Sequence, residues 1–270
     1  MPTALQRLRV DDRTVTCTSP AEAHMLWNEA TAPDGFYRHA AAGLRPGDIV
    51  LDVGANIGLT AMMFAQACPG IRLIAAEPAP TIFHCLQLNM SAYVPEGTAL
   101  RTAVGAVPGI APFTWYPHAS ANSGLYADRA ADDETTRIFL RNSGLDDASI
   151  TSITAALHDG ERIDVEVATA SAILAEHAST GEIGLLKVDV ERAELDVLLG
   201  VDESDWPRIR AVVAEVHDID GRLRQFCELL NRYGLSPRSR QDPTLAGTEL
   251  YEVYATRPTA GAAVVDLTDK

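Results

Sequence analysis

The sequence is poor in basic residues. Its 270 residues include 22 Lys and Arg against 37 Asp and Glu, which leaves a formal net charge of −15. Because binding to phosphate backbones and to anionic lipids is driven by Lys and Arg, this imbalance argues against nucleic acids and anionic membranes as substrates. We therefore expect no nucleic-acid and no membrane partner, and look instead for a small molecule or one tethered to a protein.

Long apolar runs and paired cysteines are also absent. No stretch approaches the roughly 20 apolar residues of a membrane span, and residues 1–10 lack the pattern of a secretory signal peptide. None of the cysteines forms a Cys-x-x-Cys pair, so we expect reduced thiols rather than disulfides or zinc ligands at Cys17, Cys68, Cys85 and Cys227. These absences are typical of a cytosolic protein.

A third pattern that is missing is the dinucleotide-binding G-x-G-x-x-G. The stretch IVLDVGANIG, residues 49–58, predicts a buried strand, a tight glycine turn and the start of a helix. Its spacing is Asp52-x-Gly54-x-x-x-Gly58, and Asn56 stands where a glycine must approach a pyrophosphate. This turn therefore favours a nucleoside without phosphates.

The next apolar run, residues 71–76, ends in Glu77 and Pro78. Glu77 follows the glycine turn by about 20 residues, the position at which an acidic side chain accepts the ribose hydroxyls. A ligand beside Asp52 and Glu77 needs a ribose and a positive group. S-adenosylmethionine has both, whereas the pyrophosphate of NAD would be repelled. The alternative is a glycine turn of some other α/β fold, with Glu77 merely solvated.

The alternation of strands and helices predicts an α/β fold with a doubly wound, mostly parallel sheet and an antiparallel C-terminal edge strand at residues 248–256. Earlier in the chain, we expect single strands at residues 10–18 and 99–105. A long stretch interrupts the strand–helix rhythm and is expected to cover the substrate. We divide the chain into an N-terminal helical lid, a core with this insertion, and a disordered tail, at residues 1–47, 48–256 (insertion 117–162) and 257–270.

Carboxylates and a histidine follow two of the predicted strands. Ligands of open α/β sheets bind at the carboxyl ends of the strands. The residues at these two ends are Asp189, Glu191 and Glu194 after the first strand, and Glu215, His217 and Asp218 at the second.

An alcohol is a weak nucleophile at neutral pH, and histidine is the side chain best suited to accept its proton. His217, with its ring oriented by Glu215, and His118 in the insertion are both candidates for this base, and Glu191 is a further catalytic candidate. The other five histidines are assigned to helix and lid surfaces. Two alternatives stay open: a divalent cation held by Asp189, Glu191, Glu215 and His217, or an inactive cofactor-binding module that serves in protein interaction.

The segments VLDVGANIG, AAEPAP, LLKVDVERAELDVLLG and VVAEVHD occur in this order between Asp48 and Val216. In this combination the chain resembles the FkbM-type S-adenosylmethionine-dependent O-methyltransferases. The segments TWYPHASANSGLYADRA and EVHDIDGRL are most similar to the O-methyltransferase domains of modular polyketide and mixed peptide synthases. The resemblance implies a Rossmann-like class I methyltransferase fold, with S-adenosylmethionine as cofactor and S-adenosylhomocysteine as product.

The family's roles imply cofactor contacts along the strand ends, to which we add flanking candidates from the lid and insertion. The full set is Glu22, Asp52, Gly54, Asn56, Gly58, Glu77, Pro78, Ala103, Ser123 and Asp189. The chain departs from the family pattern in two places. Arg192 stands where a Gly usually follows the segment DVE, and Thr169-Ala170-Ser171 replaces the usual Thr-Leu-Asp.

The implied acceptor is a hydroxyl, such as that of a β-hydroxyacyl group or an enol, on a polyketide- or peptide-derived intermediate. This intermediate is either free or tethered to an acyl carrier protein. Carrier proteins are commonly acidic, so docking needs a local basic patch. Its candidates are Arg129, Arg137, Arg141, Arg222 and Arg224. The oligomeric state stays open between monomer and dimer.

Overall fold

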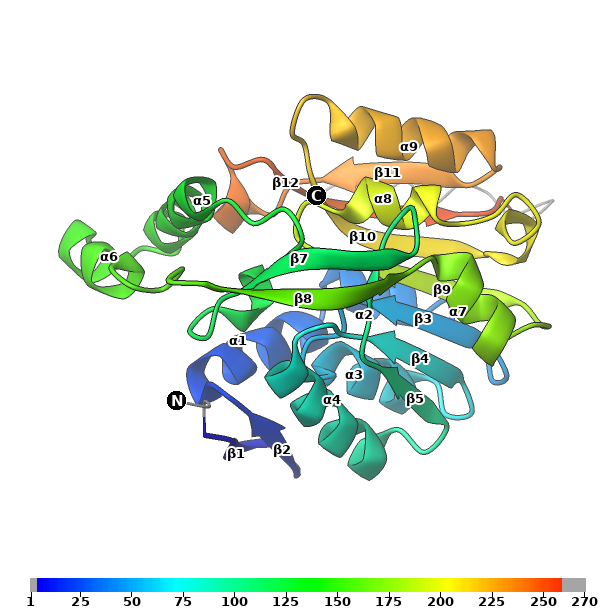
Figure 1. Ribbon diagram of the computed structural model, residues 1–270, viewed down its shortest axis with the longest axis horizontal. Coiled ribbons are helices and arrows are strands. Elements are labelled where there is room, and N and C mark those ends of the chain that lie inside the picture. Colours follow the sequence, from blue (N-terminus) through cyan, green and yellow to red (C-terminus); the bar gives the residue numbers. More distant parts are fainter. Residues whose placement is uncertain (1–3, 259–270) are drawn as a thin grey trace.

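Strands and helices alternate along the computed structural model, which describes residues 4–258 (Figure 1). The strands are β1 (Gln6–Val10), β2 (Arg13–Cys17), β3 (Ile49–Val53), β4 (Arg72–Ala76), β5 (Gly97–Leu100), β6 (Ala103–Val104), β7 (Gly109–Trp115), β8 (Glu161–Ala168), β9 (Ile183–Val188), β10 (Ala211–His217), β11 (Ser236–Arg240) and β12 (Leu250–Thr256). The helices are α1 (Pro20–Thr31), α2 (Phe36–Ala41), α3 (Leu59–Ala67), α4 (Pro80–Tyr93), α5 (Arg129–Asn142), α6 (Asp147–Thr154), α7 (Ala170–His177), α8 (Glu194–Leu199) and α9 (Arg222–Arg232). Short 3₁₀ turns are η1 (Ser120–Asn122), η2 (Trp206–Arg208) and η3 (Pro243–Leu245).

The main sheet has the order β11-β12-β10-β9-β3-β4-β5. Neighbouring strands from β10 to β5 are parallel, whereas β12 runs antiparallel to both β10 and β11. The predicted doubly wound, mostly parallel sheet is confirmed. The antiparallel C-terminal strand is β12, but it lies one place in from the edge. The edge is β11, and its sequence does not predict a strand because the segment SPRSR is polar and has no strand-like alternation.

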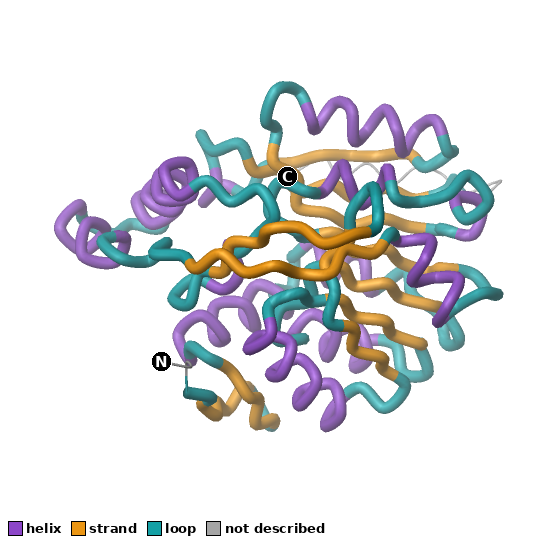
Figure 2. The backbone as a smooth tube through the Cα atoms, viewed as in Figure 1, coloured by secondary structure: helices purple, strands orange, loops and turns teal. Residues whose placement is uncertain are grey.

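Successive residues of β3 face two separate cores, as a strand covered on both faces requires. Val50 belongs to a core shared with α1, α3 and α4, whereas Leu51 and Val53 belong to a core shared with α7, α8 and α9. Figure 2 shows helices on both sides of the sheet. This arrangement leaves the carboxyl ends of the strands as the place where a ligand can reach the sheet.

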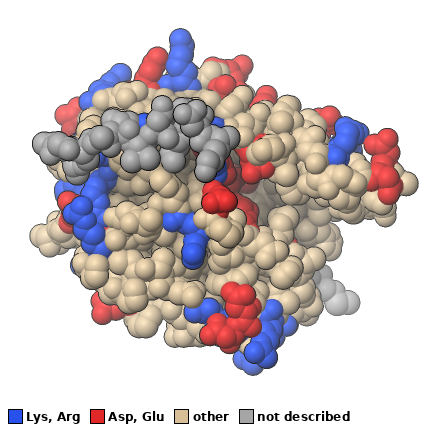
Figure 3. Space-filling view, turned by 180° about the vertical axis from the view of Figure 1, so that it is seen from behind, with Lys and Arg blue, Asp and Glu red and all other residues tan. Residues whose placement is uncertain are grey.

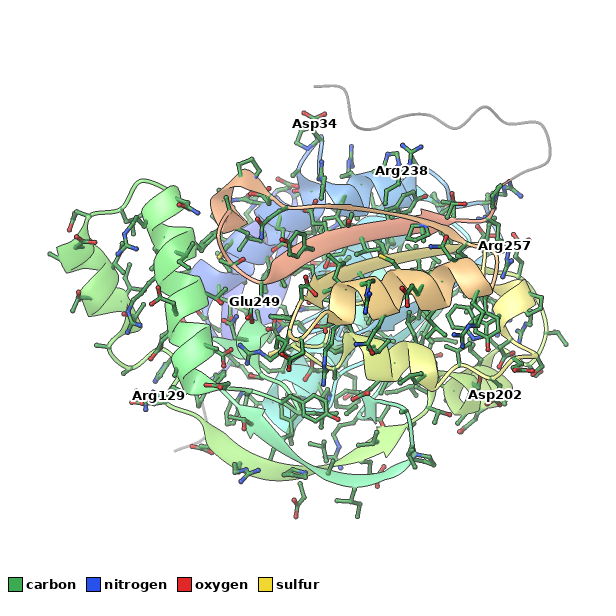
Figure 4. All side chains as sticks on the ribbon, turned by 90° about the horizontal axis from the view of Figure 1, so that it is seen from above. Asp34, Arg129, Asp202, Arg238, Glu249 and Arg257 are labelled. Carbon is green, nitrogen blue, oxygen red and sulfur yellow. The ribbon has the colours of Figure 1, made fainter. Side chains whose placement is uncertain are left out.

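The predicted strand at residues 99–105 is wrong, because this segment forms two strands of different sheets. β5 pairs with β4 of the main sheet, whereas β6 joins β8 and β7 in a three-stranded sheet. The antiparallel strands β7 and β8 carry between them an arm that contains α5 and α6 (Figure 1). Figure 4 shows this arm standing to one side of the main sheet, with Arg129 at the start of α5.

The N-terminal segment begins with a hairpin rather than the single strand predicted at residues 10–18. β1 and β2 pair antiparallel, and Asp11 takes a left-handed conformation (φ 50°) in the turn between them. The next helix starts where the sequence predicts, since Ser19 Oγ accepts a hydrogen bond from the backbone N of Glu22 and Pro20 occupies the first turn. The hairpin therefore precedes α1, the helix of the expected lid.

At the other end of the chain, Arg257 is ordered although the predicted tail begins there. Its Nε donates to the carbonyl O of Ile209 at 2.8 Å, and it lies at the opposite end of the molecule from Arg129 (Figure 4). The rest of the predicted tail, residues 259–270, lies outside the described residues. Among the helices formed by residues 4–258, none combines the length and apolar composition needed to cross a membrane.

Candidate functional site

A cavity of about 580 Å³ opens at the carboxyl ends of β3, β4, β9 and β10. The helix α1 covers it from one side and the insertion from the other. On the face shown in Figure 3, acidic side chains gather around the recess beside the α5–α6 arm. The predicted site residues that line the cavity are Glu22, Gly54, Asn56, Glu77, Pro78, Ala103, His118, Ser123, Asp189, Glu191, Glu215 and His217.

Asp52 does not line the cavity, contrary to its expected role beside the positive group of the ligand. It is fully buried, and its Oδ1 lies 3.0 Å from Nζ of Lys187, its cross-strand neighbour. The same ammonium lies 3.3 Å from Asp189 Oδ2 and donates to the carbonyl O of Gly54 at 2.8 Å. Burial lowers the pKa of Lys187, but the two carboxylates outweigh it and raise that pKa overall. The pair therefore supports the turn from beneath.

Two glycines of the turn have different roles. A Cβ on Gly54 would lie 1.7 Å from the carbonyl O of Asp189, so no side chain fits there. Gly58 does not line the cavity, contrary to its expected contact with the cofactor. It precedes α3 in a left-handed conformation (φ 88°), and a Cβ there would lie 2.7 Å from Leu86 Cδ1. Gly54 thus permits the close approach of the neighbouring loop, and Gly58 permits helix packing.

The turn, the lid and the insertion are joined by hydrogen bonds at the cavity wall. Asn56 Nδ2 donates to Ser120 Oγ at 3.1 Å, and Glu22 Oε1 accepts from the backbone N of Ala121 at 2.9 Å. Burial raises the pKa of Glu22. Ser123 Oγ accepts from the backbone N of Tyr116, which fixes the same loop. These contacts hold residues 120–123 over the glycine turn.

Glu77 lies at the end of β4 and is 7% exposed. Its Oε1 accepts from the backbone N of Ala79 at 2.8 Å. Burial raises the pKa of this carboxyl to about 7. A buried carboxyl at the cavity wall suits a ligand that donates hydrogen bonds, as the hydroxyls of a ribose do.

The cavity lining matches a cation that lacks phosphates. Among the described residues that line it, Lys187 is the one Lys or Arg, and Asp52 and Asp189 neutralise it. Phosphate-binding sites instead present free cations to the ligand. The sulfonium, ammonium and ribose groups of S-adenosylmethionine fit a lining that presents carboxylates and a neutralised lysine.

His217 lies at the end of β10 with 6% of its surface exposed. Its Nδ1 is 2.9 Å from Glu194 Oε1, and its Nε2 is 3.5 Å from Glu191 Oε2. Burial lowers the pKa of His217, but the hydrogen bond to Glu194 and the charges of both glutamates raise it overall. Burial also raises the pKa of Glu191, to about 8, although His217 partly offsets this.

Contrary to our expectation, Glu215 does not orient the ring of His217. Successive side chains of a strand point to opposite faces, so Glu215 and His217, which are two residues apart, share a face. The Nδ1 of the His217 ring nevertheless faces Glu194 of α8. Glu215 lines the cavity further along and, in its protonated form, hydrogen-bonds with Glu29 of α1. Burial, together with the charges of Asp189 and Glu29, raises the pKa of Glu215 well above its ordinary value.

Two further histidines lie at the cavity and at the arm. His118 lines the cavity from an exposed position on the loop before η1. His158 was expected on a helix surface but is 1% exposed. Its Nδ1 lies 2.8 Å from Asp133 Oδ1, and its ring packs edge-on against Tyr116 at 5.0 Å between centroids. His158 therefore anchors the arm.

The loop between β9 and α8 has a strained backbone. Glu191 (φ 51°) and Arg192 (φ 71°) are consecutive non-glycine residues in the left-handed region, each at a cost of roughly 1–2 kcal/mol. The second is the position where the resembled family usually has Gly, which would avoid that cost. The surrounding contacts of this loop must offset the strain.

The divalent-cation alternative does not fit the geometry. Asp189 is paired with Lys187 and Glu215 with Glu29, while the remaining two candidate ligands, Glu191 and His217, lie beside each other. Within the described part of the chain, His, Cys, Asp and Glu side chains form no group of three or more able to hold a metal ion.

The arginines considered as a docking patch are partnered. Arg129 Nη1 lies 2.6 Å from Asp159, and Arg141 Nη2 lies 3.3 Å from Asp147. Arg137 lies 3.7 Å from Glu134, so its charge is paired within the arm. Residues 128–159 carry three Arg against seven Asp and Glu, so the arm is net acidic.

Comparison with known proteins places the chain in a family. Residues 52–235 match the Methyltransferase FkbM domain. The chain is 40% identical over 97% of its length to the whole of the 31-O-demethyl-FK506 methyltransferase FkbM of Streptomyces tacrolimicus. It is 35% identical over 83% of its length to a segment that makes up 11% of the AMB antimetabolite synthetase AmbE of Pseudomonas aeruginosa.

Among solved structures, the chain resembles the methyltransferase FkbM from Methylobacillus flagellatus KT. The TM-score is 0.49 at 12% identity, covering 78% of this chain and 44% of the other. The sheet order and the family match agree on a class I methyltransferase fold. The chain therefore belongs to the FkbM methyltransferase family, and its methyl donor is S-adenosylmethionine.

Proposed function

We propose that the chain is an O-methyltransferase, which methylates a hydroxyl of a polyketide- or peptide-derived natural-product intermediate, and that His217 accepts the hydroxyl proton. The observation that carries this proposal is the pairing of His217 with Glu194 at the cavity wall. The relative from S. tacrolimicus is named for methylation of an O-demethyl compound, which supports oxygen as the acceptor atom.

The proton-accepting atom follows from the tautomer of His217. Glu194 is a buried acceptor, so the ring nitrogen facing it, Nδ1, carries the proton and donates it. The lone pair of a neutral ring is then left on Nε2, beside Glu191. General-base catalysis of this kind is worth about 10²–10⁴-fold in rate.

Glu191 is the second candidate for the base. Its carboxyl lines the cavity, and its pKa of about 8 lets it accept a proton in weakly basic solution. Glu215 lines the cavity too, but its bond to Glu29 engages its proton. His118 stays a candidate on position alone.

We assign the cofactor to the part of the cavity between the glycine turn and Glu77. Glu77 accepts from the ribose hydroxyls, Asn56 and Gly54 form the adjoining wall, and Asp189 lies near the cationic end. Pro78, Ala103, Ser123 and Glu22 complete the enclosure. When bound, S-adenosylmethionine supplies an electrophilic methyl group on a sulfonium centre.

The acceptor is assigned to the part of the cavity beneath the arm, which is mainly apolar. Its side chains include Phe113, Leu125, Phe139, Leu140, Ile153, Leu157 and Leu245. Apolar walls with a few convergent polar groups suit an uncharged organic molecule with an apolar body. The nearby carboxylates disfavour an anionic acceptor.

An acceptor tethered to a carrier protein is the second candidate. It is supported by AmbE, in which the matched region is a segment of a longer synthetase. The acids paired with Arg129, Arg137 and Arg141, and the excess of acids over residues 128–159, weaken the case for an acidic partner at the arm. The test therefore compares the acceptor on a carrier protein with the same acceptor offered free.

The test is methyl transfer from labelled S-adenosylmethionine to hydroxylated polyketide- and peptide-derived acceptors, offered free, as small thioesters and on a carrier protein. We expect an O-methyl product, identified by NMR. His217→Ala should lose about 10²–10⁴-fold in turnover with unchanged cofactor affinity, as expected for a group acting in the transition state. A product methylated on carbon or nitrogen would contradict the proposal.

A further inference from the structure

A buried ion pair joins the insertion to the loop that carries Glu191. Arg192 Nη2 lies 2.6 Å from Asp132 Oδ1 of α5, and the two side chains are only 6% and 4% exposed. The other oxygen of Asp132 accepts a hydrogen bond from the Tyr116 hydroxyl at 2.8 Å. Buried charges persist only where partners of this kind satisfy them.

The same arginine is connected to His217 through its backbone. The backbone N of Arg192 donates to Glu194 Oε1 at 2.7 Å, and this oxygen also faces His217 Nδ1. The carbonyl O of Arg192 accepts from Arg222 Nη1 at 2.7 Å. One residue thus contacts the insertion with its side chain and the partner of His217 with its backbone.

The backbone geometry indicates that the side chain has a role. Arg192 lies at a φ of 71°, where Gly is free of strain and an arginine is not. Its guanidinium is nevertheless buried against Asp132, and a further Nη1 contact reaches the carbonyl O of Tyr126 at 3.4 Å. The strained conformation places the guanidinium where it reaches α5.

We propose that Arg192 is a positioning residue, which couples the insertion to the proton-accepting pair by clamping loop 189–193 to α5 through Asp132. The proposal rests on the proposed function, in which His217 or Glu191 accepts the proton. One ion pair then fixes the position of the proton-accepting group relative to the part of the cavity beneath the arm, the acceptor chamber. A small displacement of such groups is enough to lower turnover by about 10²-fold.

The experiment compares Arg192→Gly, Arg192→Lys and Asp132→Asn with a matched control. Arg208→Ala removes an ion pair of the same 2.6 Å length, to Asp205, on η2 and outside the cavity lining. Folding is checked by circular dichroism and cofactor affinity by calorimetry. Two further readouts are turnover with a fixed acceptor, and the NMR titration of the His217 ring with S-adenosylhomocysteine bound.

The charged groups that act on His217 are Glu194, Glu191 and Arg192, and the arginine lowers its pKa. We expect Arg192→Gly to raise the titration midpoint of His217 and to lower turnover about 10–100-fold while cofactor affinity holds. Arg192→Lys keeps the charge, so its midpoint should stay near that of the parent and part of the turnover should return.

Asp132→Asn keeps an acceptor for Tyr116 but leaves Arg192 unpaired, so it should lose turnover as Arg192→Gly does. Arg208→Ala should leave both the midpoint and turnover as they are. A folded Arg192→Gly protein with parental turnover and an unmoved His217 midpoint overturns the proposal. If no acceptor is methylated at all, the proposed function fails, while the titration still decides whether Arg192 acts on His217.

Discussion

Lys187 and Asp52 face each other across β9 and β3, with Lys187 Nζ 3.0 Å from Asp52 Oδ1 in the interior of the sheet. The side chains are 2% and 0% exposed. Asp189 shares the ammonium, and its Oδ2 also accepts from the Tyr37 hydroxyl at 3.0 Å. The charge balance beneath the glycine turn therefore depends on one lysine.

Replacing Lys187 with Met should destabilise the fold by about 3–5 kcal/mol, because removing one partner leaves buried carboxylates unpaired. Urea unfolding followed by circular dichroism measures the change. The double variant Lys187→Met, Asp52→Leu should recover part of the loss, since it removes a charge with its partner. A single variant as stable as the parent would show that the pair is not needed.

Glu77→Gln should weaken cofactor binding by about 2–3 kcal/mol, the upper range for hydrogen bonds to charged groups. The amide keeps an acceptor for the backbone N of Ala79, so the fold should persist. Because burial places the pKa of Glu77 near 7, parental affinity should also increase between about pH 6 and pH 8 as the carboxylate forms. Calorimetry across this range checks both effects, and identical affinities for parent and variant would rule out this ribose contact.

The rate should depend on pH through His217. Its pKa is raised, so the neutral base forms only above the ordinary histidine value of about 6.5. Glu194→Gln removes one of the two glutamates that raise the pKa of His217, so the acid limb of kcat/KM should move to lower pH while the maximum rate falls. A limb that stays in place after this substitution excludes His217 as its source.

The free energy of unfolding should also depend on the protonation of His217. The folded state binds the proton of His217 more tightly than the unfolded state does. The contribution of His217 to stability is therefore full below about pH 6.5 and is lost as the pH rises through the folded pKa. Comparing the pH dependence of the free energy of unfolding for the parent and His217→Ala measures the contribution of His217.

A chelator should change turnover by less than about twofold, because the carboxylates at the strand ends are paired with Lys187 and His217 and, among the described residues, form no group of three around a cation. His118→Ala, assayed beside His217→Ala, decides between the two histidines. Abolition of activity by chelator, with both variants near parental rates, would instead support metal assistance.

Reversing the charges of Arg137 and Arg141 tests the arm as a docking site. Exposed ion pairs contribute about 0–1 kcal/mol, so the fold should persist. A carrier protein bound at the arm makes the tethered acceptor faster than the matching small thioester, and the double Glu variant should narrow that gap. Equal rates on both acceptors in the parent favour a diffusible substrate.

The sequence was most informative where local pattern and position in the sheet agree. The apolar runs at residues 59–67 and 183–188 predict a helix and a strand, and these are the bounds of α3 and β9. Both are apolar and bounded by clear turns, so burial leaves one solution. The approach of Glu77, Asp189 and His217 to one cavity follows from parallel strand order alone.

What could not be predicted depends on side-chain direction and on contacts distant in sequence. Glu194 reaches His217 from α8, and no local pattern distinguishes it from Glu215 as the partner. Lys187 did give a signal, since a lone lysine in the buried run LLKV needs a buried counter-charge. The pairing of Arg192 with Asp132 joins segments 60 residues apart along the chain, from position 132 to 192, and only the tertiary structure reveals it.

The insertion is held by residues from every part of the chain, which has a consequence for the order of folding. Glu22 binds its loop from the N-terminal helix, Arg192 binds α5 from the middle, and Asn142 Nδ2 donates to the carbonyl oxygens of Thr244 and Ala246 near the end. Such long-range contacts form late, because the intervening chain must first be ordered. During synthesis the acceptor chamber therefore cannot close until the segment around residue 246 has left the ribosome.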